Sequence, residues 1–138
     1  MPNFVAEVMT KNPETLPATA TVAEAAQIMR DKNIGDVIVL EGDDVCGIVT
    51  DRDIVIRGLA EGGDVQTKLG DICSKDLTTL DVDAKIGDAV KLMEEKAVRR
   101  LPVVEDGKPI GIVTLGDLSL VWDRDSALSQ VSAAPPTT

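Results

Sequence analysis

Apolar residues recur along this chain with two different spacings, and each spacing predicts one kind of element. From Val22 to about Asn33 they stand three and four positions apart, which is typical of a helix with one buried face. Two short runs rich in β-branched residues follow at 37–40 and 45–49, with a polar Gly- and Asp-containing turn between them. Such a pair predicts a β-hairpin. A second helix is expected to begin at Thr50.

Both helices of this segment carry start signals. Thr21 and Glu24 form the Thr-x-x-Glu pattern of a capping box, in which the two residues satisfy each other's backbone N–H groups. For the second helix, we expect Ile54, Val55 and Leu59 to supply the buried side. The segment therefore predicts the element order β-α-β-β-α.

The whole pattern returns 64 residues later. Residues 5–54 align with residues 69–118 without a gap, and 14 of the 50 pairs are identical. The identities are densest where Gly47-Ile-Val-Thr50-x-x-Asp53 aligns with Gly111-Ile-Val-Thr114-x-x-Asp117. A unit of about 60 residues is only marginally stable alone, so we expect the two copies to pack as a pseudo-twofold pair.

This alignment defines the expected organisation of the chain. We predict an α+β fold with a first repeat at 1–60, a polar linker at 61–68 and a second repeat at 69–125. The remaining residues, 126–138, are rich in Ser, Ala, Pro and Thr and are expected to be disordered.

The charge and hydropathy of the chain exclude several classes of partner. The net charge is −10 and Lys and Arg form no basic run, so nucleic acid and anionic membrane surfaces are not expected to bind. No apolar run approaches the roughly 20 residues that span a bilayer, and the N-terminus lacks a secretory pattern. We therefore expect a cytoplasmic location.

The residue types available also limit the chemistry. The chain has no His and no Tyr, so a Ser-His-Asp triad, a Cys-His pair and a His-based zinc site are impossible within it. The spacing of Cys46 and Cys73 matches no zinc or redox motif, and we expect both to be small core residues rather than a metal or redox site. The prediction is that the chain is not an enzyme, holds no metal and needs no cofactor.

The repeated motifs resemble those of the CBS (cystathionine β-synthase) domain pair, also called a Bateman module. The resemblance is carried by Gly47-Ile-Val-Thr-Asp-Arg-Asp53, Val98-Arg-Arg-Leu-Pro-Val-Val104 and Gly111-Ile-Val-Thr-Leu-Gly-Asp117. It extends over residues 3–123 and is similar to small stand-alone bacterial pairs of the hypoxic response type. It implies that the two repeats pack as one module and that two chains form a homodimer.

The resemblance also implies a ligand. Paired CBS domains bind AMP, ADP, ATP or S-adenosylmethionine in two clefts between the repeats. In the family, the Asp accepts hydrogen bonds from the ribose hydroxyls, and this role maps to Asp53 and Asp117. The Thr contacts phosphate or ribose, and this role maps to Thr50 and Thr114. The residue chemistry agrees, because a carboxylate can accept both hydroxyls of a cis-diol and a helix N-terminus favours phosphate.

The two repeats differ where similar proteins place basic residues on the phosphates. The second repeat has Arg99 and Arg100 there, and the planar guanidinium is suited to phosphate. The first repeat has Gly35 and Asp36 at those positions, and an Asp repels phosphate. One cleft is therefore expected to be weak, empty or specific for a less charged ligand.

Each of these residues also has a purely structural interpretation. Thr-x-x-Asp at a helix start is itself a capping pair. Gly47 and Gly111 suit a tight turn or a bulge as well as the close approach of a ligand. Arg99 and Arg100 could be a solvated strand edge paired with carboxylates, which contributes only about 0–1 kcal/mol.

The sequence thus leaves two functions open. The first is a regulatory sensor that binds an adenosine nucleotide and signals to a separate effector protein. The alternative is a ligand-free interaction module that dimerises and holds a partner in a stress response. Binding of a nucleotide would discriminate between them.

Overall fold

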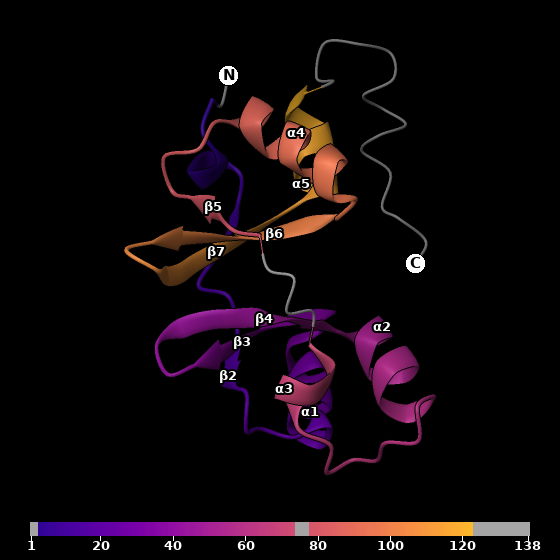
Figure 1. The fold of residues 1–138 in the computed structure, drawn as a ribbon. Coiled ribbons are helices and arrows are strands. Elements are labelled where there is room, and N and C mark those ends of the chain that lie inside the picture. Colours follow the sequence, from indigo (N-terminus) through magenta and orange to yellow (C-terminus); the bar gives the residue numbers. More distant parts are fainter. Residues whose placement is uncertain (1–2, 74–77, 123–138) are drawn as a thin grey trace. The chain divides into compact units, whose positions relative to one another are not determined.

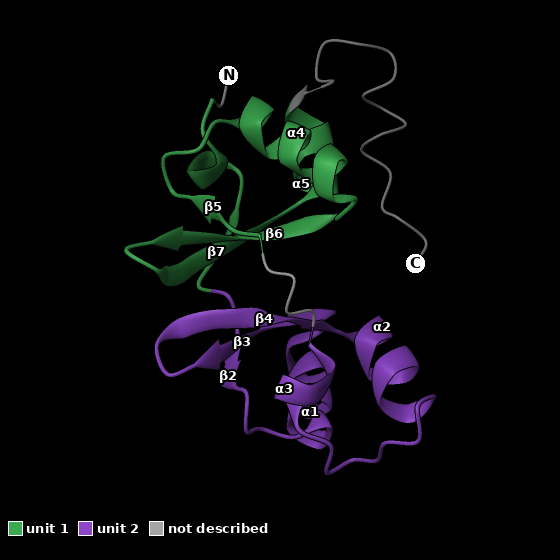
Figure 2. Ribbon diagram, in the orientation of Figure 1, with its two compact units in different colours: residues 1–12, 78–138 green, residues 13–77 purple. Residues whose placement is uncertain are grey.

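The chain folds into two compact units that do not coincide with the two halves of the sequence. The computed structural model describes residues 3–73 and 78–122, without the side chain of Trp122; the tail expected at 126–138 lies outside the described residues. Unit 2 contains residues 13–77, and unit 1 contains residues 1–12 together with 78–138 (Figure 2). The first repeat thus lies mainly in unit 2 and the second mainly in unit 1.

Unit 2 is built around a three-stranded sheet of order β2-β3-β4 (Figure 1). Strand β2 is parallel to β3, and β3 forms an antiparallel hairpin with β4. The elements are β2 (Thr15–Pro17), α1 (Val22–Lys32), β3 (Asp36–Glu41), β4 (Asp44–Thr50), α2 (Asp51–Asp53), the π-helix η2 (Ile54–Leu59) and α3 (Leu69–Ile72).

Unit 1 repeats this arrangement around a four-stranded sheet of order β1-β7-β6-β5. Strand β5 is parallel to β6, while β6 and β7 form the hairpin and β1 adds an antiparallel edge. The elements are the 3-10 helix η1 (Val5–Glu7), β1 (Thr10–Lys11), β5 (Leu80–Asp81), α4 (Ile86–Lys96), β6 (Arg100–Glu105), β7 (Lys108–Thr114) and α5 (Leu115–Trp122). The predicted α+β class and the β-α-β-β-α order are confirmed.

The turns follow from local chemistry. Helices α1 and α4 end at Asn33 and Ala97, both in the left-handed conformation that closes a helix. In the second hairpin Asp106 and Gly107 have φ values of 52° and 79°, as a type I′ turn requires. In the first hairpin Gly42 has a φ of 66°, which glycine adopts without strain. Both predicted hairpins are therefore confirmed.

Each unit has its own aliphatic core. In unit 2 the buried face of α1 packs on the sheet, and Cys73 belongs to this core while Cys46 packs against it half-buried. Both cysteines thus pack as small core residues, as predicted. In unit 1 the buried face of α4 packs on the sheet in the same way. Met29 of α1 and Met93 of α4 are buried at equivalent positions of the two repeats.

The two sequence repeats exchange their first segments. Val5 opens the first repeat but is fully buried in unit 1, where its N–H donates to the carbonyl of Ala84 at 3.0 Å. Leu69 opens the second repeat but is fully buried in unit 2, where its N–H donates to the carbonyl of Ala20 at 2.8 Å. The repeat boundaries at 1–60 and 69–125 stay a prediction, whereas the compact units divide after residues 12 and 77.

The segment expected to be a linker, 61–68, is part of unit 2 and caps a helix. The N–H groups of Val22 and Ala23, at the start of α1, donate to the carbonyls of Thr67 and Val65 at 2.9 and 3.1 Å. The next N–H, of Glu24, donates to the Thr21 hydroxyl at 3.3 Å. Because the first N–H groups of a helix have no partner within it, these bonds fix the segment in place.

The prediction for the second helix of the first repeat is wrong in part. Ile54 is buried, but Val55 and Leu59 are 54% and 51% exposed. Residues 54–59 form a π-helix, whose wider turn displaces side chains from the faces that α-helical spacing predicts. The other buried residue of this segment is Gly58, where an added Cβ would lie 3.7 Å from the side chain of Ile72.

Substitution of Gly111 is expected to loosen the N-terminal segment from unit 1. An added Cβ would lie 2.9 Å from the carbonyl oxygen of Thr10 and closer still to the sulfur of Met9. Gly111→Ala should therefore lower the free energy of unfolding by about 1–3 kcal/mol, measured by urea denaturation. Gly116→Ala is the control, because its Cβ would lie 3.7 Å from the nearest atom, the Thr114 hydroxyl oxygen. An equal loss in both variants would contradict this account.

Candidate functional site

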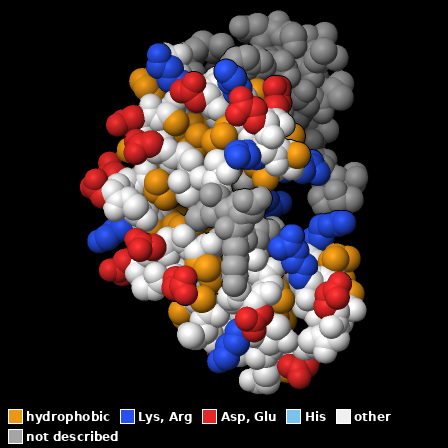
Figure 3. Space-filling model, viewed as in Figure 1, with side chains coloured by type: hydrophobic (Ala, Val, Ile, Leu, Met, Phe, Trp, Pro, Cys, Tyr) orange, Lys and Arg blue, Asp and Glu red, His pale blue; other side chains and the backbone are white. Residues whose placement is uncertain are grey.

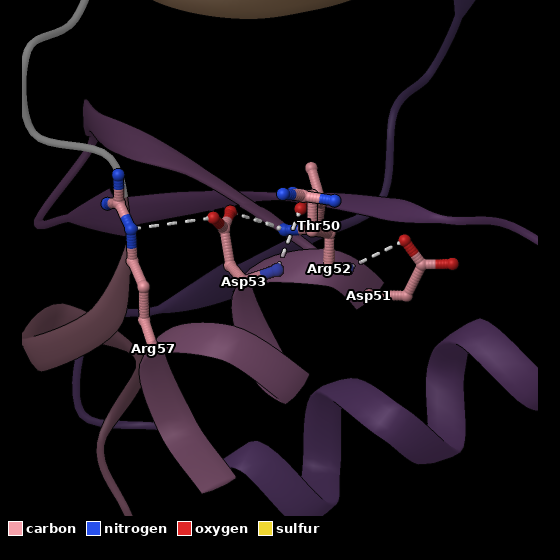
Figure 4. A network of polar contacts seen from close by, with 5 residues as sticks. All are labelled: Thr50, Asp51, Arg52, Asp53 and Arg57. Carbon is pink, nitrogen blue, oxygen red and sulfur yellow. Dashed lines mark hydrogen bonds and ion pairs between the residues drawn. The ribbon is translucent and has the colours of Figure 1, made fainter. Parts of the chain in front are cut away.

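The first Thr-x-x-Asp motif closes the junction between β4 and α2 with two reciprocal hydrogen bonds (Figure 4). The N–H of Asp53 donates to Thr50 Oγ1 at 3.1 Å, and the N–H of Thr50 donates to Asp53 Oδ2 at 2.9 Å. Thr50 is extended, with φ of −114° and ψ of 165°, so the chain turns from strand to helix at this residue. The pair therefore satisfies two backbone donors and fixes both side chains.

The second motif has the same geometry. The N–H of Asp117 donates to Thr114 Oγ1 at 3.1 Å, and the N–H of Thr114 donates to Asp117 Oδ2 at 2.9 Å. Both motifs therefore cap a helix in the structure, as the structural interpretation predicted. The bonds leave the Thr hydroxyl hydrogen and the second carboxylate oxygen, Oδ1, outside the capping interaction.

The residues on the neighbouring strand lie beside each motif. Arg100 pairs with Thr114 in the ladder between β6 and β7, and the carbonyl of Arg99 accepts the N–H of Leu115 at 2.7 Å. The backbone at Arg99 and Arg100 thus lies next to the start of the second motif within unit 1. Arg99 is exposed and Arg100 is half-buried.

The first repeat has the same arrangement with different side chains. Asp36 pairs with Thr50 in the ladder between β3 and β4, and the carbonyl of Gly35 accepts the N–H of Asp51 at 3.1 Å. The two arginines of the second repeat are therefore replaced, in the same positions of the fold, by a glycine and a carboxylate.

A cation that our sequence reasoning missed lies on the helical side of the first motif. Arg57 Nε is 3.8 Å from Asp53 Oδ1, with the two side chains 53% and 15% exposed (Figure 4). The spacing i,i+4 in a helix is the signal that could have found it. The equivalent position of the second repeat holds Val121, so the two carboxylates have different surroundings.

Gly47 and Gly111 precede the threonines of the two motifs, within strands β4 and β7, and the sheet itself gives each a structural role. Gly111 pairs with Lys11 of β1 and Val103 of β6, and β1 approaches it too closely for a side chain. Gly47 is buried opposite Val39, beside the register shift of its hairpin. The structural interpretation thus accounts for Gly111, and a ligand contact of either glycine stays a prediction.

Within residues 3–73 and 78–122, no group of three or more His, Cys, Asp or Glu side chains is placed to hold a metal ion. No helix in the described part of the chain is both long enough and apolar enough to cross a bilayer.

The comparisons with known proteins identify the family. The family model described as CBS domain matches residues 5–59 and 69–122. The chain therefore belongs to the CBS domain family and carries a tandem CBS pair, which confirms the resemblance inferred from its motifs.

Two curated relatives and one solved structure illustrate this membership. The CBS domain-containing protein YhcV of Bacillus subtilis is 37% identical over 116 residues, which cover 84% of this chain and 83% of the relative. Hypoxic response protein 1 of Mycobacterium tuberculosis is 41% identical over 101 residues, covering 72% of this chain and 71% of the relative. The CBS domain pair of protein MJ0100, solved in complex with 5′-methylthioadenosine and S-adenosyl-L-methionine, aligns with a TM-score of 0.77 and 26% identity, covering 89% of this chain and 98% of that one.

The capping interaction makes a stability prediction that is independent of any ligand. Thr114→Ala removes the acceptor for the Asp117 amide and should lower the free energy of unfolding by about 1 kcal/mol. Thr114→Ser keeps the hydroxyl and should lose much less. Urea unfolding followed by circular dichroism measures both, and an equal loss in the two variants would mean that the Thr methyl group, rather than the cap, stabilises the junction.

Proposed function

We propose that this CBS pair is a regulatory module that binds adenosine ligands, of the AMP, ADP, ATP or S-adenosylmethionine type, at its Thr-x-x-Asp motifs. The observation that carries the proposal is the identical, fixed placement of Thr and Asp at two strand-to-helix junctions. The complex of the MJ0100 pair with two adenosine compounds supports the ligand class.

The capping bonds leave groups suited to a nucleoside. Asp117 Oδ2 accepts the Thr114 amide, so Oδ1 is available to accept hydrogen bonds from a ribose cis-diol. Thr114 Oγ1 accepts the Asp117 amide through a lone pair, which leaves its hydrogen to donate to a phosphate or ribose oxygen. Both side chains are held before the ligand arrives, so little conformational entropy is lost on binding.

The phosphate would be held mainly by side chains rather than by the helix. Of the first three amides of α5, those of Leu115 and Asp117 already donate to Arg99 and Thr114. Few free N–H groups are thus left at this helix start for a phosphate. Arg99 and Arg100 supply the positive charge instead, in the forked geometry that suits phosphate.

The output of the module would be a change in affinity for a separate effector protein. A ligand can shift a protein between two states only by binding one of them more tightly. Under this proposal the adenosine compound is a regulatory ligand and not a cofactor, and the chain itself carries out no reaction.

A ligand panel tests this proposal. Thermal denaturation with AMP, ADP, ATP, S-adenosylmethionine and NADH should show a stabilisation of about 2.7 kcal/mol when an adenosine ligand is present at 100 times its Kd. Asp117→Ala should weaken AMP binding more than Asp53→Ala, because Arg99 and Arg100 lie in the second repeat, as Asp117 does.

The controls separate binding from capping. Asp117→Asn keeps an acceptor for the Thr114 amide while removing the charge, so it should retain stability but lose affinity. Thr21→Ala removes a helix cap elsewhere, in α1, and should bind as the wild type does. Stabilisation by no member of the panel would contradict the proposal, and equal effects at Asp53 and Asp117 would contradict the assignment of the phosphate site.

A second function, a homodimeric interaction module, is favoured by apolar side chains on the helical segment after the first motif. Val55, Ile56 and Leu59 are 54%, 47% and 51% exposed. On the face drawn in Figure 3, apolar side chains reach the surface among charged ones. We propose that these three residues contact a second copy of the chain, which is compatible with ligand binding and is also the arrangement expected if no ligand binds.

Charge introduced into this helical surface should dissociate the dimer. The double substitution Val55→Asp and Leu59→Asp should change the mass measured by light scattering from about twice the 14.6 kDa of one chain to a single chain. Val65→Asp is the control, since Val65 is 56% exposed in the segment between α2 and α3. A monomeric wild type, or equal dissociation by the control, would contradict the proposed surface.

A further inference from the structure

The N-terminal segment of residues 3–12 is joined to unit 1 by a short ladder. Strand β1 has only two residues, and both are exposed. Further backbone bonds run from the N–H of Val5 to the carbonyl of Ala84 at 3.0 Å and from the N–H of Asn12 to the carbonyl of Ile110 at 3.3 Å. Segments with so few ladder bonds open locally at low free energy. The apolar side chains of the segment are therefore needed to hold it in place.

Met9 is one of these side chains, and it packs half-buried against the core of unit 1. It lies over Gly111 of β7, because a Cβ added to that glycine would lie 2.9 Å from Met9 Cγ and closer still to the sulfur. The carbonyl oxygen of Thr10 is 2.9 Å from the same point. The Met9 sulfur thus fills the space that a side chain at position 111 would need, and the packing between them is tight.

Met9 is more exposed than the other methionines that the structure describes. Met29 in α1 and Met93 in α4 are 8% and 3% exposed. The residue aligned with Met9 in the other repeat is Cys73, which is 5% exposed in the core of unit 2. Among these four sulfur atoms, a solvent-borne oxidant therefore reaches that of Met9 most readily.

We propose that Met9 is a site of reversible oxidation by peroxide, and that its oxidation releases the N-terminal segment from unit 1. One oxygen atom passes from hydrogen peroxide to the thioether: the O–O bond breaks, an S=O bond forms, the sulfur loses two electrons and the peroxide leaves as water. Ligand binding at the Thr-x-x-Asp motifs takes no part in this reaction.

Release follows from the polarity of the sulfoxide. Its oxygen is a strong acceptor, and burial without a donor is costly. The Cα of Gly111 and the carbonyl oxygen of Thr10 are not N–H or O–H donors, so the sulfoxide gains more from water than from this contact. Withdrawal of Met9 would pull β1 from β7 and uncover a strand edge that can pair with another chain.

Treatment of the full chain with hydrogen peroxide is the test. Peptide mass spectrometry should show that Met9 gains an oxygen atom at least about tenfold faster than Met29 or Met93. After this oxidation the Val5 amide should exchange its hydrogen about tenfold faster. The Leu69 amide is the matched control, because it is aligned with that of Val5 but donates within unit 2, and its exchange should not change.

Variants separate Met9 from the other sulfur atoms of the chain. Met9→Leu keeps a similar apolar volume but cannot be oxidised, so peroxide should leave its Val5 exchange unchanged. This variant retains both cysteines, including the half-buried Cys46, and so controls for thiol oxidation. Methionine sulfoxide reductase should restore slow exchange in the oxidised wild type. Met9→Gln introduces a polar group without peroxide, should speed Val5 exchange by itself, and serves if the leucine variant does not fold.

The possible outcomes are distinct. Oxidation of Met29 or Met93 as fast as that of Met9, or an equal response of the wild type and Met9→Leu, would overturn the assignment to Met9. Complete oxidation of Met9 with unchanged exchange at Val5 would overturn the release of the segment. Neither result bears on the proposed function, which the ligand panel tests separately.

Discussion

The reciprocal hydrogen bonds between Thr and Asp at the two strand-to-helix junctions are the constraint on which the site depends. Each bond pair turns the chain from an extended residue directly into a helix and holds a hydroxyl and a carboxylate at the turn. The same turn places the first residue of the preceding strand directly opposite the threonine. The residue opposite each threonine is therefore determined by the register of the hairpin and not by the motif itself.

The elements themselves could be predicted from the sequence, because their signals are local. The helical spacing from Val22, the Gly-Asp and Asp-Gly turns and the Thr-x-x-Asp starts each act within a few residues, and all are observed where expected. The alignment of the two copies reinforced each element with a second example. Local chemistry repeated at a fixed interval is strong evidence even without related sequences.

What the sequence did not reveal depends on contacts between distant residues or on departures from regular geometry. No local feature of Val5 or Leu69 shows that each packs in the unit of the other repeat. The π-helix after Asp53 exposes Val55 and Leu59 against an α-helical expectation, and it breaks the equivalence with α5. Gly111 was expected to suit a ligand or a turn, but its neighbours are Met9 and Thr10, about a hundred residues earlier in the chain.

The structural and the binding interpretations of Thr-x-x-Asp do not compete, because they use different atoms. The cap uses one carboxylate oxygen and the lone pair of the hydroxyl, whereas a nucleoside would use the other oxygen and the hydroxyl hydrogen. A capped junction offers these groups in a fixed orientation, which an unconstrained loop could do only at a cost in entropy. An alanine at either position removes both roles together, so loss of binding in such a variant does not by itself assign the residue to the ligand. A variant that keeps the backbone bond and changes only the charge, Asp117→Asn, therefore separates the folding of the junction from its recognition of a ligand.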